Sequence, residues 1–163
     1  MTQFINRFFT VIGQIAQWLT LGVVLLTFIV VVMRYGFNLG SIALQESLSY
    51  FHAFAFMLGI AYTLHHNEHV RVDVFYGAMS ESRKAWVDLL GTVLLMWPTM
   101  FFVVWISAPY VADSWAILEG SNESGSLDAV YILKTALLIM PVLVILQSFQ
   151  ILSDNLKTLK GAH

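Results

Sequence analysis

The sequence predicts an all-α integral membrane protein with four transmembrane helices and both termini on the inner, cytoplasmic side of the membrane (N-in/C-in). Two observations lead to this fold class. The 163 residues are 58% hydrophobic and only 11% charged, whereas a soluble domain carries about 25% charged residues. Four apolar stretches also reach the length of about 20 residues that a helix needs to cross the hydrocarbon core. Helices are expected because backbone groups in lipid must be paired internally and no β-barrel alternation is present.

The four stretches are bounded by charged residues, Gly or Asn and form one expected four-helix domain over residues 1–163. They cover residues 11–33, 44–64, 86–107 and 131–152. The first contains GVVLLTFIVVVM, which is apolar on every face, and it is closed by Arg34. It lacks the short core and cleavage site of a secretory signal, so we expect a retained anchor. Pro98 and Pro141 lie within the last two spans and are expected to kink them without breaking them.

The residues before the first span have a helical pattern of their own. Apolar side chains recur at helical spacing from Phe4 to Ile12, opposite a polar ridge that runs from Gln3 to Gln17. Two interpretations stay open. One is a helical extension that lies at the inner membrane interface before the span begins, and the other is one long tilted helix that starts near Gln3.

The positions of lysine and arginine predict the orientation, because basic residues concentrate in cytoplasmic loops. With both termini inside, the inner side carries Arg7, Arg71, Arg83, Lys84, Lys157 and Lys160. The outer side carries Arg34 and, at the start of the fourth span, Lys134. The connection over residues 108–130 then faces outward with acidic residues as its only charges.

His65, Glu68 and His69 match the H-x-x-E-H signature of inverted zinc peptidases. The segment that follows, HVRVD, alternates β-branched and charged residues and is poor helix material. A third ligand could come from Asp73, Glu81 or Asp88, but the chain has no soluble domain to fold around such a site. We interpret the motif as a solvated inner loop. A membrane-embedded metal-dependent peptidase that uses His65, Glu68 and His69 is the alternative function.

Several other classes of protein lack their required residues here. Pumps and carriers place ionisable groups deep in their spans, but His52 is the deepest ionisable side chain, and a bis-histidine haem site would need a second one facing it. The absence of cysteine excludes disulfides and Fe–S clusters, and a net charge of −2 gives no nucleic-acid footprint. The residues therefore predict a protein that is not an enzyme, holds no metal or cofactor, and acts by docking onto a partner.

Five motifs in order resemble a known family between about residues 30 and 150. They read MRYGFN, ALQESLSYFHAFAFMLGIAYTL, HVRVDVFY, AWVDLLGTVLL and SWAILEGSNESGSLDAVYILK. Together they are similar to the small membrane subunit of tripartite ATP-independent periplasmic (TRAP) transporters. The resemblance implies a location in a bacterial or archaeal inner membrane and an accessory subunit that binds and scaffolds a large membrane subunit. It also implies that the large subunit carries the sodium and substrate sites for ion-gradient-driven uptake of a small organic acid, a carboxylate or keto acid, delivered by a periplasmic binding protein.

The chain departs from the family pattern at two places. Many members read W-x-E-E at the start of the second span, where this chain reads Ala43-Leu44-Gln45-Glu46. The outer loop reads GSLD over residues 125–128 in place of GGLP, although Gly125 still predicts a turn. The first departure puts in doubt any role that needs two neighbouring acids.

The first group of candidate residues is expected at a subunit interface or in a structural role. It comprises Arg34, Gln45, Glu46, Ser49, His52, His69, Arg71 and Asp73. Arg34 and Glu46 end consecutive antiparallel spans, and we expect them to pair directly or through water, or else to extend separately into solvent. Gln45, Ser49 and His52 share one helix face, where they hydrogen-bond either the large subunit or this four-helix unit.

The remaining candidates lie in the two longer connections. His69, Arg71 and Asp73 either organise the inner turn, with Arg71 bound to helix-end carbonyls or membrane lipid, or contact the large subunit. The candidates for docking the binding protein are Trp115, Glu119, Ser121, Glu123 and Lys134. An acidic outer loop can steer a partner, and the alternative is a loop that only caps the helix ends.

Overall fold

The computed structural model describes residues 2–68 and 73–161, and these residues form helices without any strand. The elements are α1 (Thr2–Gly36), α2 (Ile42–His65), α3 (Asp73–Tyr76), α4 (Glu81–Gly91), the π-helical segment η1 (Thr92–Met96), α5 (Trp97–Ala116) and α6 (Val130–Gly161). Four segments are long and apolar enough to cross a membrane, namely Ile5–Gly36, Ile42–His65, Glu81–Ala116 and Val130–Gly161. The predicted all-α fold with four spans is confirmed, and each helix extends beyond its predicted span at both ends. The predicted roles of His69 and Arg71 fall outside the described residues, and Asp73 is described by its backbone alone.

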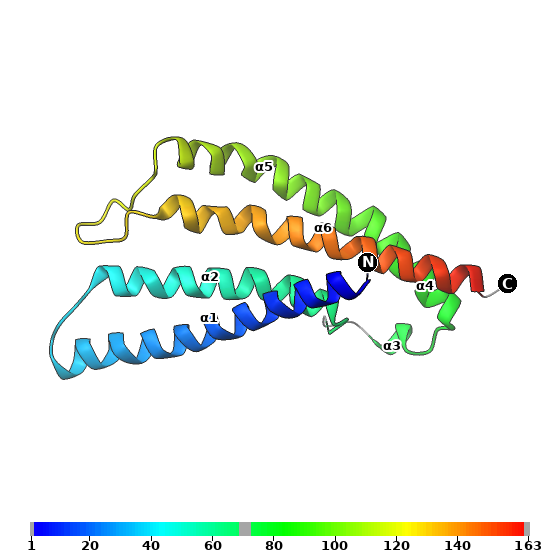
Figure 1. Cartoon of the computed structure of the whole chain (residues 1–163), viewed down its shortest axis with the longest axis horizontal. Helices are drawn as coiled ribbons and strands as arrows, with labels where there is room; N and C mark the ends of the chain where they lie inside the picture. Colours follow the sequence, from blue (N-terminus) through cyan, green and yellow to red (C-terminus); the bar gives the residue numbers. More distant parts are fainter. Residues whose placement is uncertain (1, 69–72, 162–163) are drawn as a thin grey trace.

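The helices lie side by side in one layer (Figure 1). In the view down the shortest axis, α1, α2, α6 and α5 follow one another, and α1 packs on α2, α2 on α6, and α6 on both α4 and α5. In the described part of the chain, α1 and α5 make no contact of similar extent that would close the layer into a ring. The last helix therefore lies between the second and third spans, and the layer presents two broad faces.

The two ends of the layer differ in what they contain (Figure 1). Both chain termini and the α2–α4 connection lie toward one end, which we call the termini end. The α1–α2 connection and the α5–α6 loop, residues 117–129, lie at the other end, which we call the loop end.

The N-terminal residues form one continuous helix with the first span, so the interpretation as a single long helix is confirmed. At 1.5 Å per residue its 35 residues extend about 50 Å, which exceeds a hydrocarbon core of about 30 Å. The buried residues of α1 all lie in its first half, at positions 9, 12, 13 and 16. Many of its later apolar side chains, such as Val24 and Phe28, are exposed.

A small apolar core lies where α1, α2 and α6 meet. Its buried members are Phe9, Ile12, Ala61 and Leu143. Gly13 allows α1 to approach α2 closely there, because a Cβ on this residue would lie 2.2 Å from the ring of Tyr62. Between α5 and α6, the indole Nε1 of Trp97 donates to the Ser148 hydroxyl at 2.7 Å.

Individual residues account for where α2 begins and ends and for the π-helical segment in the third span. The Ser41 hydroxyl accepts from the Leu44 N–H at 3.4 Å and caps the start of α2. Asn67 ends α2 with a φ of 58°, a left-handed conformation that asparagine tolerates. In the third span, η1 ends at Met96, two residues before Pro98, which cannot donate a backbone hydrogen bond. The π-helical turn accommodates the missing backbone hydrogen bond, and the span stays helical as predicted.

Candidate functional site

His65, the last residue of α2, joins three helices at the termini end. Its Nδ1 lies 3.0 Å from the amide oxygen of Gln147 on α6 and acts as the donor, because an amide oxygen only accepts. Its ring stacks on Phe9 of α1 with centroids 5.0 Å apart. Gln147 is only 2% exposed, and a buried amide needs such a partner. His65 is thus a polar contact within the helix layer.

This arrangement bears directly on the H-x-x-E-H motif. Glu68 is exposed, and His69 lies outside the described residues. Residues 2–68 and 73–161 contain no group of three His, Asp or Glu side chains placed to hold a metal ion. The expected solvated loop is wrong for His65, because this residue ends α2, stacks on Phe9 and bonds Gln147 within the helix layer. No observation favours the peptidase alternative.

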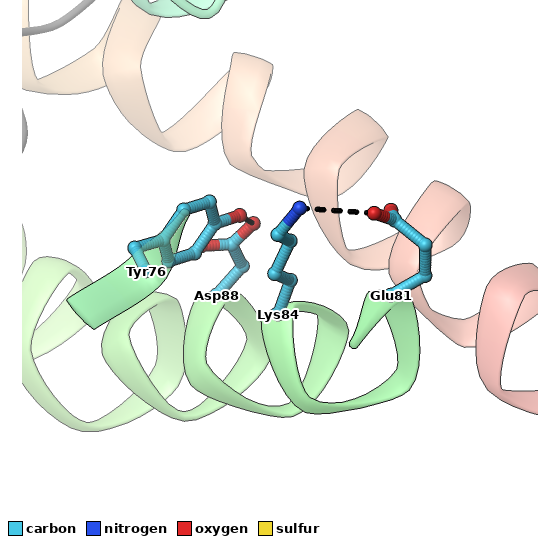
Figure 2. Close-up of polar contacts among 4 residues, drawn as sticks. All are labelled: Tyr76, Glu81, Lys84 and Asp88. Atoms are coloured by element: carbon cyan, nitrogen blue, oxygen red, sulfur yellow. Dashed lines mark hydrogen bonds and ion pairs between the residues drawn. The ribbon is translucent and has the colours of Figure 1, made fainter. Parts of the chain in front are cut away.

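The connection between α2 and α4 is tied back onto α4 by a pair that sequence reasoning did not predict (Figure 2). The Tyr76 hydroxyl donates to the Asp88 carboxylate at 2.7 Å, and Lys84 binds Glu81 at 3.0 Å. Lys84 also lies 5.8 Å from the centre of the Tyr76 ring. The only sequence signal for this contact is the position of Tyr76 at the end of the HVRVDVFY motif.

At the loop end, Glu46 anchors the α5–α6 loop. The Ser121 hydroxyl donates to one oxygen of its carboxylate at 2.6 Å, and the Leu127 N–H donates to the other at 2.7 Å. The predicted direct pairing of Arg34 with Glu46 is corrected, because no ion pair joins them in the described chain and both carboxylate oxygens serve the loop. Glu46 reaches across to the loop because α2 packs against α6, whereas Arg34 is exposed at the end of α1.

A second set of contacts joins α5 to α6 beside this anchor. Glu119 forms an ion pair with Lys134, and the Lys134 ammonium lies 3.9 Å from the centre of the Tyr110 ring. The hydrogen bond from Lys134 holds the pKa of the Glu119 carboxyl below its ordinary value. Trp115 donates from Nε1 to the Thr135 hydroxyl at 2.9 Å. Four of the five predicted docking residues, Trp115, Glu119, Ser121 and Lys134, therefore make side-chain contacts within the chain.

Two of the five docking candidates, Trp115 and Glu123, are more accessible than the other three. Trp115 is 47% exposed despite its hydrogen bond, and Glu123 is exposed near the tip of the loop. The turn predicted at Gly125 is present with a φ of 81°, a conformation that glycine adopts without strain. The structure thus divides the loop into residues that hold its shape and residues that face outward.

One face of α2 carries exposed polar residues along the span. Gln45, Ser49 and His52 are all exposed, and in the described chain none of their side chains has a hydrogen-bond partner. The ring of His52 stacks with Phe56 at 6.2 Å. His52 also lines a groove of about 620 Å³ between α1 and α2. The alternative that these residues bond within the four-helix unit thus finds no contact to support it, and contact with a partner stays a prediction.

Comparison with known protein families gives one match. Residues 23–158 match the family described as "Tripartite ATP-independent periplasmic transporters, DctQ component". The match begins within α1 and ends within α6, so it includes all of α2, the Glu46 anchor and the α5–α6 loop. Neither a curated protein nor a solved structure matches the chain.

Replacing His65 by Ala should destabilise the helix layer, because the buried Gln147 amide would lose its partner. An unsatisfied buried polar group costs about 1–3 kcal/mol, and thermal unfolding of the purified chain in detergent measures the loss. Glu68→Ala is the control and should unfold at the wild-type temperature, since Glu68 is exposed. Equal melting temperatures for both variants would contradict a structural role for His65.

The Glu119–Lys134 ion pair should make the loop end sensitive to acid. Since the folded chain lowers the pKa of Glu119, the pair stabilises the fold above the ordinary pKa of this carboxyl and ceases to do so as pH falls through the lowered value. Glu119→Gln should therefore melt below wild type at about pH 7, and the gap should close as pH falls through the lowered pKa of Glu119. Glu123→Gln is the control and should match wild type at neutral pH. A gap for Glu119→Gln that persists undiminished in acid would disprove this assignment.

Proposed function

The chain belongs to the DctQ component family of tripartite ATP-independent periplasmic transporters, and from that premise we propose that this small membrane subunit binds the large membrane subunit of its transporter and scaffolds it. The observation that carries the proposal is the single layer of helices. In the apolar windows of the first and third spans, only 6% of the residues are buried inside the chain. A layer with two broad, uncovered faces is suited to lie against a larger membrane protein.

In the proposed transporter, the large membrane subunit carries out transport. The large subunit would hold the coupling ion and a small organic acid, and a periplasmic binding protein would deliver that acid. The charges of this chain support such a role, because the other ionisable side chains of its described spans lie nearer the span ends than His52 does. We further propose that the termini end faces the cytoplasm of a bacterial or archaeal cell, in agreement with the basic residues at that end.

The loop end is then the proposed surface for the binding protein. Glu46 and the Glu119–Lys134 pair hold the α5–α6 loop in place, and Glu123 presents an exposed carboxylate near its tip. An acidic surface that is held rigid steers a partner without a large ordering cost.

Reconstituted uptake tests the scaffolding role. Proteoliposomes that hold both membrane subunits, with binding protein and substrate outside and an ion gradient, should accumulate the acid, whereas vesicles without this chain should not. The two membrane subunits should also co-purify after co-expression. Full uptake by the large subunit alone, or uptake by this chain alone, would contradict the proposal.

Charge reversal at the loop tests docking separately. Glu123→Lys should raise the concentration of binding protein that gives half-maximal uptake, because the substitution reverses a surface charge without removing an internal contact. The melting temperature should stay unchanged. Glu119→Lys provides the contrast, since it breaks the ion pair with Lys134 and should lower the melting temperature as well. An unchanged dependence on binding protein in Glu123→Lys would reject the docking surface.

A further inference from the structure

The groove between α1 and α2 is a preformed cleft on a face of the layer. Thr20 and Val23 line it from α1, and Ala55, Gly59 and Thr63 line it from α2 at successive turns. Its volume of about 620 Å³ is enough for several side chains. A Cβ added to Gly59 would meet no atom within 4 Å, so the groove is open above this glycine. Small residues along such a floor let another helix approach closely.

His52 places a hydrogen-bonding side chain in this groove, so an occupant of the groove needs a polar group at that position. It is the eleventh residue of the 24-residue α2, so it lies near the middle of the span. The side chain is exposed, and its one ring contact in the described chain is with Phe56. An imidazole has two nitrogens that need hydrogen-bond partners, and lipid tails at this depth supply none. The groove therefore favours an occupant that brings a polar side chain into the membrane.

The two threonine hydroxyl groups that line the groove do not donate to His52, because each already donates to a backbone carbonyl. Thr20 donates to the Ala16 carbonyl and Thr63 to the Gly59 carbonyl, each at 2.8 Å. The polar face also continues from His52 through Ser49 to Gln45 toward the loop end. A single polar atom would not match a face of this length, whereas a helix that runs along α2 would.

We propose that the groove seats one transmembrane helix of the large subunit, and that this helix presents a carboxylate, amide or hydroxyl group to His52. The inference rests on the proposed function, because it assigns the surface through which this chain would scaffold its partner. His52 supplies the hydrogen bond that sets the register of the two helices, and Gly59 supplies the space for their close approach.

Co-purification of groove variants with the tagged large subunit tests the inference. Gly59→Leu fills the groove and His52→Leu removes the hydrogen bond, and each should lower the recovery of this chain about tenfold, which corresponds to the loss of one such contact. The matched controls are Gly91→Leu, where an added Cβ also meets open space, and Thr99→Leu on exposed α5. Both controls should co-purify like wild type. The isolated Gly59→Leu chain should keep the wild-type melting temperature, so that lost recovery reports binding.

The outcomes separate the two proposals. If wild type does not co-purify with the large subunit, the proposed function fails. If wild type and both groove variants co-purify equally, the scaffolding role stands and the groove inference is overturned. Because the chain has no cysteine, an Ala55→Cys variant can carry a single benzophenone. Crosslinking to the large subunit supports the inference, and crosslinking only to lipid or a second copy of this chain overturns it.

Discussion

The helices of this chain are held in place by a few polar and close-packed contacts, since apolar surface gains little by leaving lipid tails for a neighbouring helix. His65 and Gln147 connect α2 to α6, and Trp97 and Ser148 connect α5 to α6. The close approach at Gly13 adds α1. These contacts are enough to order a layer, and they leave broad apolar faces that either lipid or the proposed membrane partner can cover.

A few polar contacts also hold the α5–α6 loop in place at the loop end. A loop of thirteen residues, 117–129, would be mobile without anchors, because ordering each residue costs about 1–2 kcal/mol of backbone entropy. Glu46 fixes it from α2 and the Glu119–Lys134 pair fixes its first turn against α6. In this way one carboxylate near the start of a span determines the surface that the loop presents, and it does so across the α2–α6 boundary.

The two ends and the face of the layer then have separate roles. The loop end offers an ordered acidic surface, and the termini end ties the α2–α4 connection to α4 through Tyr76 and Asp88. The face between α1 and α2 offers a groove lined by His52, whose side chain has no hydrogen-bond partner among the described residues. A subunit built in this way can contact a soluble partner and a membrane partner at the same time, because the two surfaces point in different directions.

The sequence alone determined the fold class, the number of spans and the likeness to a transporter subunit, because hydrophobic length and local motifs are properties of short segments. It also placed His52 and Glu46 among the candidate residues. Only the tertiary structure decided which residues meet: Glu46 binds the loop and not Arg34, His65 bonds Gln147 eighty-two positions away, and Tyr76 reaches Asp88. These partners depend on the order α1, α2, α6, α5 in space. Nothing in the periodicity of an individual helix specifies that order, since a helix that is apolar on every face fits equally well beside any neighbour.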